Sequence, residues 1–262
     1  MKKKKIILFI IALAFVLTLF FFIFKTSDKK FENSVDATPL QDITPTKTDI
    51  LRRDTVASKD YLMGKFDPAK MENFVSVAKN YAIPGFAGLY LRKETFDAFV
   101  KMSDEAKKDG VTLKIISATR NFDTQKGIWN TKWEKYHDIK QVLTYSAMPG
   151  TSRHHWGTDM DINSVDLAYF NTEKGKKEYE WLSKNAKTFG FCQPYSAKGT
   201  DRKTGHSEEK WHWSYIPLSK TFTQDFKNRI KQSDLIGFSG VEKISEVNII
   251  DEYVLGINPE CL

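Results

Sequence analysis

An apolar run near the amino end limits how this chain can fold and on which side of a membrane it can lie. Residues 6–24 contain one polar residue, Thr18, and follow a block of four lysines. As a helix rising about 1.5 Å per residue, the run would span nearly the hydrocarbon core of a bilayer. Because lysines beside such a helix stay on the cytoplasmic side, the rest of the chain is expected beyond the membrane.

A cleaved signal peptide is the alternative interpretation of this run. Signal peptides usually end in small residues just before the cleavage site. Such residues are missing after Phe24, and Ala12 and Ala14 come too early in the run. We therefore predict an uncleaved single-pass anchor over residues 1–25. The protein is then expected at the cell membrane, with its working domain outside the cytoplasm.

The chain beyond the anchor divides into three segments by composition. Residues 26–58 are rich in Lys, Asp, Thr and Pro, which predicts a flexible linker. Residues 59–235 hold apolar-periodic stretches separated by turn residues and are expected to form one folded domain. Residues 236–262 form a C-terminal extension. The hydrophobic content of 41% is high enough for a packed core, which excludes a wholly disordered chain.

Periodicity predicts a mixture of helices and short strands in this part of the chain. Helices are expected at residues 68–81, 94–108, 121–136, 172–188 and 245–254, and strands at residues 111–116, 158–163 and 211–216. These elements do not alternate as regular βαβ units. They favour an α+β domain in which helices flank a small antiparallel sheet, preceded by one transmembrane helix.

The formal net charge of +7 does not indicate a nucleic-acid partner. Part of it comes from the amino-terminal lysine block, and the remaining basic residues are interspersed with acidic ones, as at Arg92, Lys93 and Glu94. No basic stripe stands out from this mixture, so binding to nucleic acid is not expected.

The two cysteines, Cys192 and Cys261, fit an exported protein, in which a disulfide can form. Neither belongs to a CxxC pair or lies near a histidine in the sequence, which argues against a cysteine nucleophile. A structural disulfide and two buried thiols are both compatible with these positions.

Three of the five histidines fall in two short clusters, residues 152–161 and 209–213, that also contain carboxylates. A zinc hydrolase needs about three His or Asp/Glu ligands and an open position for water. It also needs a carboxylate that leaves the metal free and accepts the water's proton. The clusters supply such a set, with His154, Asp161 and His212 as ligands and Glu209 as base.

Strand geometry is compatible with this grouping. Asp159 and Asp161 would share one face of their strand, and His212 would point away from the tryptophans on either side of it. Glu209 has the opposite parity to His212, which places it in the turn before the second strand. The alternative is a surface histidine pair and a buried histidine bonded to a glutamate, and spacing alone does not separate these interpretations.

The clusters resemble the signature motifs of the VanY-type zinc D-alanyl-D-alanine carboxypeptidases, SxHxxGxAxD and ExWH. The matching residues are Ser152, His154, Gly157, Asp161, Glu209, Trp211 and His212. A third element of that family, a strand ending in SGYRS with a glutamine soon after, is echoed by residues 117–122 and Gln125. The resemblance extends from about residue 61 to about residue 217.

This resemblance implies a fold like that of the zinc D-Ala-D-Ala peptidases and hydrolysis of the terminal D-alanyl-D-alanine bond of peptidoglycan stem peptides. It implies that Zn²⁺ is bound by His154, Asp161 and His212. Glu209 would act as general base, and Arg120 would hold the substrate or stabilise the oxyanion. The expected substrate-binding residues are Arg120, Gln125, Ser152 and Asp159. We expect the protein to act as a monomer.

Two departures from the family pattern leave alternatives open. Asp159 stands where the family usually has Ala, and its strand face allows it to support a ligand, to face the substrate or to bind the metal. The third element has Ala118 for Gly and Thr119 for Tyr, so the scissile bond is open as well. An L,D-carboxypeptidase or a peptidoglycan endopeptidase would use the same zinc site, and a zinc-stabilised wall-binding module is the non-enzymatic alternative.

Overall fold

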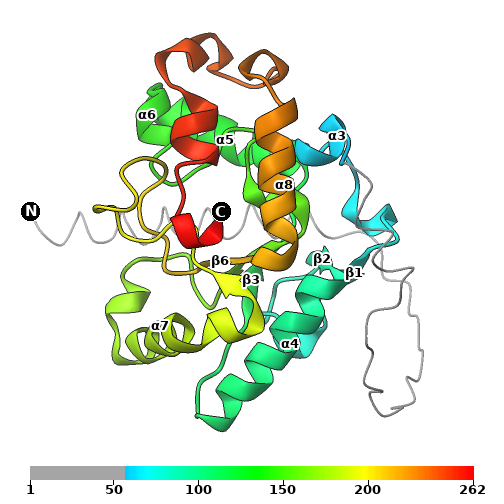
Figure 1. The fold of residues 1–262 in the computed structure, drawn as a ribbon, viewed down its shortest axis with the longest axis vertical. Helices are drawn as coiled ribbons and strands as arrows, with labels where there is room; N and C mark the ends of the chain where they lie inside the picture. The colour runs from blue at the N-terminus through cyan, green and yellow to red at the C-terminus, as the bar shows by residue number, and fades with distance from the viewer. Residues whose placement is uncertain (1–56) are drawn as a thin grey trace, which may run out of the picture. The chain divides into compact units, whose positions relative to one another are not determined.

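The computed structural model describes residues 57–262 (Figure 1). The expected anchor and almost all of the expected linker therefore lie outside the described residues. Between residues 57 and 262, no helix is both long enough and apolar enough to cross a membrane.

The described chain contains six α-helices and six short strands, joined by turns of 3-10 helix. The helices are α3 (Lys59–Leu62), α4 (Lys93–Lys108), α5 (Phe122–Tyr136), α6 (Ile139–Val142), α7 (Glu173–Asn185) and α8 (Ile216–Arg229). The strands are β1 (Phe74–Ser76), β2 (Tyr90–Arg92), β3 (Ile115–Ser117), β4 (Asp159–Ile162), β5 (Phe191–Cys192) and β6 (His212–Tyr215).

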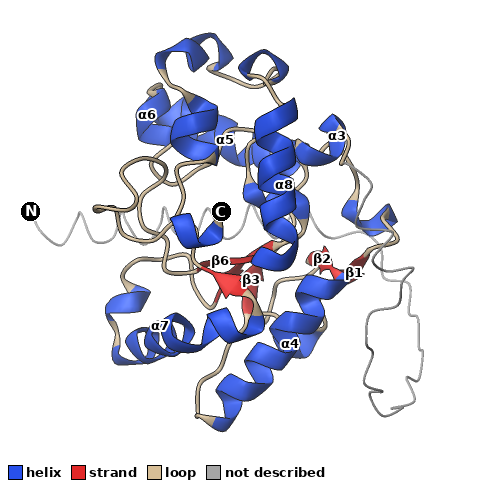
Figure 2. Cartoon of the chain, in the orientation of Figure 1, coloured by secondary structure: helices blue, strands red, loops and turns tan. Residues whose placement is uncertain are grey.

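The strands form two antiparallel sheets (Figure 2). One is the pair β1–β2, and the other has four strands in the order β3-β4-β6-β5. In the register between β4 and β6, Asp161 lies opposite His212 and Asp159 lies opposite Ser214. The predicted α+β class with a small antiparallel sheet is therefore confirmed.

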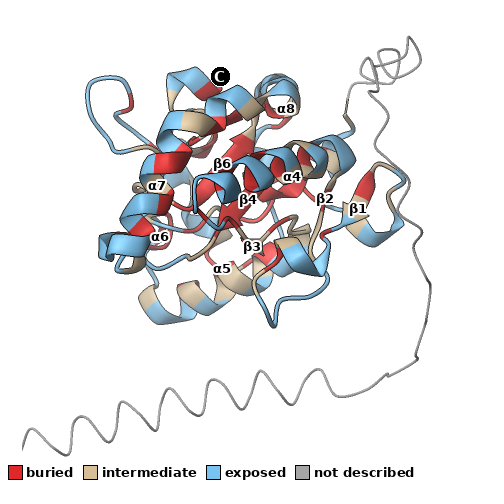
Figure 3. Cartoon of the chain, turned by 90° about the horizontal axis from the view of Figure 1, so that it is seen from below, coloured by how far each residue is buried: buried red, intermediate tan, exposed pale blue. Residues whose placement is uncertain are grey.

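The four-stranded sheet separates two hydrophobic cores. The core shared with α4 and α7 receives Met160 and Ile162 from β4 and Trp213 from β6. Because side chains alternate along a strand, Asp159, Asp161 and His212 project from the opposite face. Both central strands are buried, as Figure 3 shows behind α4. The alternation thus collects polar groups on one face of a buried sheet.

The second core lies among α5, α6, α8 and the end of the chain, above the sheet in Figure 1. It contains the indoles of Trp129, Trp133 and Trp156. Residues 236–262, expected as an extension, contribute Phe238, Val247, Ile249 and Val254 to it. A disulfide between Cys192 and Cys261, with 5.7 Å between their Cα atoms, ties the end of the chain to β5.

Three parts of the secondary structure differ from the sequence-based expectation. Residues 245–254, expected as one helix, form the end of a 3-10 helix, Val241–Glu246, and a π-helix, Ile249–Val254. The helix predicted at residues 68–81 is wrong, because this segment forms β1 between two turns of 3-10 helix, Pro68–Lys70 and Lys79–Tyr81. Pairing of β1 with β2 along residues 74–76 outweighs the local helical spacing. Helix α8 was not expected, since no element had been assigned to residues 217–235.

Candidate metal centre

Three predicted ligands converge at the junction of β4 and β6. His154 comes from a turn of 3-10 helix, Arg153–Trp156, while Asp161 and His212 face each other across the two strands. One ligand atom from each of the three lies within 4.8 Å of the others. Asp161 Oδ1 is 3.4 Å from His154 Nε2 and 3.3 Å from His212 Nδ1. All three side chains are buried.

The hydrogen bonds of the two imidazoles show which nitrogens are available to a metal. His154 Nδ1 lies 2.8 Å from the carbonyl oxygen of Ala118, which can only accept, so this nitrogen carries the hydrogen and Nε2 keeps its lone pair. His212 Nε2 lies 3.0 Å from Asp159 Oδ1, which leaves Nδ1 turned toward Asp161. The nitrogens on the side of the Asp161 carboxylate, His154 Nε2 and His212 Nδ1, are therefore the ones that a metal would bind.

Two atoms of the triad are buried without a hydrogen-bond partner among the described residues. They are His154 Nε2 and Asp161 Oδ1. Buried polar atoms are nearly always hydrogen bonded, so an unpartnered pair this close together is typical of atoms that bind an ion. Two imidazoles and one carboxylate are also a common zinc ligand set with one position open. The residues therefore fit a zinc ion.

The surroundings move the pKa values of the two imidazoles in opposite directions. Burial lowers the pKa of His154 to about 4, and the Arg120 guanidinium acts in the same direction, so the ring is neutral at pH 7. Burial also opposes the charged form of His212, but hydrogen bonds to the Asp159 and Asp161 carboxylates outweigh it and raise the pKa of His212 to about 9. A metal at this site therefore displaces a proton from His212.

Glu209 lies beside the triad in the turn before β6, as the sequence predicts. Its Oε2 is 3.5 Å from His212 Nδ1. Burial, and then the nearby Asp161 carboxylate, raise the pKa of Glu209 to about 7. The main chain of Glu209 is held on both sides, because its N–H donates to Tyr195 O at 2.9 Å and its carbonyl accepts from Gln193 Nε2 at 3.0 Å. A buried carboxyl group with a pKa near 7 is suited to accept and return a proton.

Arg120 follows β3 and reaches toward the triad from the other side. Its Nη2 is 3.5 Å from Asp161 Oδ2, and its Nη1 donates to Gln125 Oε1 at 3.0 Å. The Arg120 side chain is 21% exposed, whereas Gln125 is completely buried and donates to Ala147 O at 2.7 Å. Gln125 therefore orients the guanidinium from behind.

A cleft of about 600 Å³ opens in front of these groups. Asp161, Glu209 and Arg120 line it together with Lys132 of α5. Its rim carries exposed apolar side chains, namely Phe86, Tyr145, Val165 and Leu167. The catalytic candidates thus lie at the base of an open cleft that combines two cations with apolar walls.

Three residues expected to bind substrate do not line this cleft. Ser152 is 2% exposed, and Gln125 and Asp159 are completely buried. Asp159 accepts hydrogen bonds from Arg153 and from Thr158 in addition to its contact with His212. In this structure none of these three side chains lines the cleft, so their assignment to substrate binding stays a prediction. Arg120 is the one substrate-binding candidate that faces the cleft.

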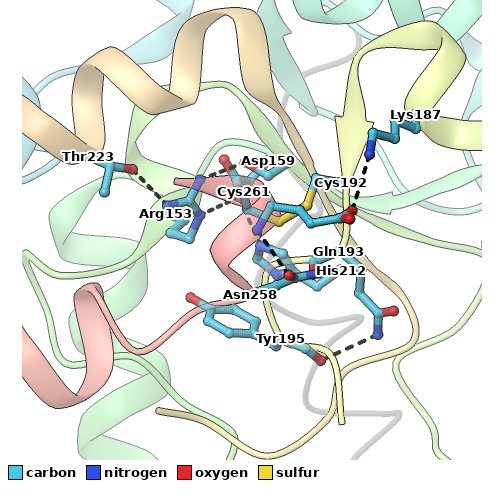
Figure 4. Close-up of a disulfide and its surroundings, with 12 residues drawn as sticks. Arg153, Asp159, Lys187, Cys192, Gln193, Tyr195, His212, Thr223, Asn258 and Cys261 are labelled. Atoms are coloured by element: carbon cyan, nitrogen blue, oxygen red, sulfur yellow. Dashed lines mark hydrogen bonds and ion pairs between the residues drawn. A yellow bond between two sulfur atoms is a disulfide. The ribbon is translucent and has the colours of Figure 1, made fainter. Parts of the chain in front are cut away.

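Arg153 and His155, the neighbours of the ligand His154 in sequence, are buried and make contacts that the sequence does not predict. The Arg153 side chain is 1% exposed and pairs with Asp159 at 3.0 Å (Figure 4). His155 contacts the Arg120 carbonyl oxygen through Nδ1 at 2.6 Å and accepts from the Gly150 N–H at 3.1 Å. His155 thereby fixes the backbone of Arg120. The contact between His155 and Arg120 has no local sequence signal, because it joins segments that only the fold brings together.

Comparison with known proteins agrees with this arrangement. Residues 88–218 match the family model described as VanY, D-alanyl-D-alanine carboxypeptidase. YodJ of Bacillus subtilis, named as a candidate carboxypeptidase, is 34% identical over 135 residues, which are 48% of this chain and 46% of that protein. A D-alanyl-D-alanine carboxypeptidase of Enterococcus faecalis is 32% identical over 123 residues, or 44% of each chain. The chain thus spans less than half the length of these relatives.

A solved structure supports the same relationship. The LD-carboxypeptidase LdcB, described for its recognition of peptidoglycan, is 26% identical, with a TM-score of 0.50 over 70% of this chain and 80% of that one. The family match covers half of this chain and includes Arg120, both ligand clusters and Glu209. The chain therefore belongs to the VanY D-alanyl-D-alanine carboxypeptidase family.

Proposed function

We propose that this protein is a zinc-dependent D,D-carboxypeptidase that removes the terminal D-alanine from peptidoglycan stem peptides. The observation that carries the proposal is a triad of three ligand atoms within 4.8 Å of one another, next to a fourth group, Glu209, that is not needed as a ligand. Zinc sites that only hold a fold are usually closed by four protein ligands. Three ligands and a free carboxylate therefore favour hydrolysis over the wall-binding module.

The chemistry of the proposed reaction can be assigned to groups around the cleft. A bound zinc ion supplies Lewis-acid activation of water and of the scissile carbonyl. Glu209 accepts the proton of the attacking water and returns it to the leaving amine. The Arg120 guanidinium is placed to stabilise the negative charge that develops on the carbonyl oxygen, a contribution of about 3 kcal/mol for one donor.

Lys132 supports a substrate that ends in a free carboxylate. It lines the cleft and is half-buried, with Nζ 3.4 Å from Tyr145 O. Burial lowers the pKa of Lys132, and no carboxylate lies within ion-pair distance of its Nζ in the described part of the chain. An unpaired, partly desolvated cation is costly unless a ligand brings an anion. A terminal carboxylate provides one, which favours release of a terminal residue over an internal cut.

An L,D-carboxypeptidase is the second candidate. The likeness to the LD-carboxypeptidase LdcB and the altered residues Ala118 and Thr119 favour it. The two activities share the terminal carboxylate, the metal site and the base. They differ in the configuration of the residue that precedes the scissile bond.

Purified muropeptides distinguish these activities. The protein is incubated with pentapeptides, tetrapeptides and cross-linked dimers, and the products are identified by mass spectrometry. Loss of one D-Ala from the pentapeptide supports D,D-carboxypeptidase action, and loss from the tetrapeptide alone supports the L,D alternative. Cleavage of the cross-link indicates an endopeptidase. A zinc-loaded, folded protein that leaves all three substrates intact contradicts hydrolysis of peptidoglycan peptides.

We further propose that residues 1–25 anchor the protein in the membrane and that residues 26–58 tether an extracytoplasmic, monomeric domain. The support is the apolar run behind a lysine block. Membrane fractionation with protease protection tests this placement. Protein that remains in the soluble fraction, or that proteases added outside cannot reach, contradicts it.

A further inference from the structure

A buried arginine lies behind the metal centre and has no role in the chemistry proposed above. We propose that Arg153 and Asp159 act together as positioning residues that orient His212 and strengthen its binding to the metal. The inference requires only that the triad binds a metal ion, and it is independent of which bond the protein cleaves.

The guanidinium of Arg153 contacts four partners, of which Asp159 and Thr223 are labelled in Figure 4. Its Nε donates to Asp159 Oδ1 at 3.0 Å, its Nη1 to Thr223 Oγ1 of α8 at 3.0 Å, and its Nη2 to Ser214 Oγ of β6 at 2.7 Å. The group also lies over the Trp156 ring, 5.0 Å from its centroid. Because four separate partners hold the guanidinium in place, its positive charge stays next to the Asp159 carboxylate.

The Asp159 carboxylate in turn holds the imidazole of the metal ligand His212 in one orientation. Its Oδ1 faces His212 Nε2 at 3.0 Å, and its Oδ2 accepts from Thr158 Oγ1 at 2.6 Å. The bond to Nε2 keeps the hydrogen on that nitrogen, so that Nδ1 is the nitrogen that would bind a metal. A carboxylate on the far nitrogen of a ligating histidine typically contributes about 10- to 100-fold in metal affinity.

Arg153 is what allows an ionised Asp159 at this position. Two other carboxylates, Asp161 and Glu209, already surround His212. A third buried carboxylate without a partner would carry a large desolvation penalty. Arg153 and Asp159 therefore form a buried charge pair directly behind the metal ligand His212.

The decisive experiment removes both charges at once. A single substitution leaves one buried charge without its partner and is expected to destabilise the fold for that reason alone. The double variant Arg153→Met/Asp159→Ala avoids this and leaves the three ligands in place. Its companion, Arg153→Met/Asp159→Asn, keeps an acceptor opposite His212 Nε2. Glu178→Gln is the matched control, because Glu178 is a buried carboxylate that accepts from Tyr169 at 2.6 Å and contacts none of the ligands.

The readout is the zinc affinity of the folded protein, measured by competition with a chromophoric chelator. We expect the Arg153→Met/Asp159→Ala variant to bind zinc about 10- to 100-fold more weakly than the parent, and the Asp159→Asn companion to recover part of the loss. The Glu178→Gln control should match the parent. Cobalt substitution gives a second signal, since a change in the orientation of His212 alters the ligand-field spectrum.

Parent-like zinc affinity in the folded double variant overturns the proposal, and so does an equal loss in the Glu178→Gln control. If the double variant does not fold, Ser214→Ala and Thr223→Val provide the test, because each removes one hydroxyl that accepts from the guanidinium and leaves both charges in place. Each is then expected to weaken zinc binding several-fold, and parent-like affinity in both overturns the proposal. Hydrolysis is not measured, so a failure of the proposed peptidase activity remains distinguishable.

Discussion

The carboxyl group of Glu209 lies close to the metal ligands in the cleft. Two residues of the segment after β5 hold its main chain. Tyr195 and Gln193, which hold it, belong to the stretch after β5, whereas His212 belongs to β6. These main-chain bonds do not involve the carboxyl group, so they remain when the Glu209 side chain is replaced. The raised pKa of Glu209 follows from its burial at this place.

Glu209→Ala should retain zinc and its fold but lose hydrolysis of stem peptides by about 10²- to 10⁴-fold, because it removes the proton acceptor. Zinc content by atomic absorption and product release by chromatography are measured on the same preparation. A variant that holds a full zinc equivalent and cleaves at the parent's rate shows that Glu209 is not the base.

Arg120→Lys should lower turnover by about 100-fold with little change in zinc content, because a lysine cannot reproduce the planar contact with Gln125 and the oxyanion at once. Steady-state kinetics on pentapeptide substrates measure the effect. Unchanged kcat would remove Arg120 from the catalytic assignment.

Lys132→Met should raise KM for peptides with a free terminal carboxylate by about 10-fold or more, because a hydrogen-bonded charge pair is lost. Peptides amidated at that end should be poor substrates for the parent and show no further loss in the variant. Lys135→Met, an exposed lysine on the same helix, is the control. An equal response to free and amidated peptides contradicts the carboxylate contact.

The elements that carry the ligands were predictable, because local patterns define them. The alternation Asp159, Met160, Asp161, Ile162 marks a strand with one apolar face, and helices α4, α5 and α7 are confirmed within a few residues.

Helix α8 escaped prediction because it continues directly from β6 without a side-chain cap or an intervening loop. Arg153 escaped because its partners Ser214 and Thr223 lie 61 and 70 residues away in sequence. The triad was thus predictable, and the long-range hydrogen bonds that hold Arg153 behind it were not.

The segment between β5 and β6 is pinned to the end of α6 by a buried histidine. His206 Nδ1 lies 2.7 Å from the carbonyl oxygen of Leu143, and its ring packs against Tyr195 and Tyr253. Burial lowers the pKa of His206 to about 4. The hydrogen bond to Leu143 acts in the opposite direction, and nearby positive charges, Arg202 among them, lower the pKa further. The ring is therefore neutral in the folded protein at pH 7.

This shift predicts acid sensitivity in a defined range. Above pH 6.5, the ordinary pKa of histidine, neither the folded nor the unfolded chain binds a proton at His206. Between pH 6.5 and about 4, only the unfolded chain binds one. The free energy of unfolding therefore falls as the pH falls through this range. The loss attributable to His206 is about 3 kcal/mol. Urea unfolding of the zinc-free parent and of His206→Asn, whose amide can still donate to Leu143 O, should show a smaller pH dependence in the variant. Equal slopes in this range would contradict the shift.

On the scale of the whole molecule, the end of the chain forms part of the support for the site. Beyond the disulfide, the Asn258 N–H donates to Pro194 O at 2.8 Å, and Arg202 donates to His206 O at 2.8 Å and contacts Gly256 O at 3.5 Å. These bonds join the final residues to the segment that holds Glu209. The carboxyl end therefore stabilises the same segment as β5.

Loss of the disulfide should lower stability by about 4 kcal/mol on chain-entropy grounds, because it joins residues 69 positions apart. Thermal unfolding of Cys192→Ser/Cys261→Ser should show a Tm lower by about 10 °C in a domain of this size. Reductant should lower the Tm of the parent similarly and leave the variant unchanged, because the chain has no other cysteine. Equal melting temperatures for oxidised and reduced parent would show that the bond carries no stability.

The same bond closes a covalent ring from residue 192 to residue 261. Glu209 and His212 lie inside this ring, whereas His154 and Asp161 precede it. The stretch 197–201 is exposed and is the natural point of attack for a protease. Because a single cut there opens the ring without dividing the molecule, the base and the third ligand stay attached to the other two. A nicked protein can therefore survive as one particle with its catalytic groups still joined.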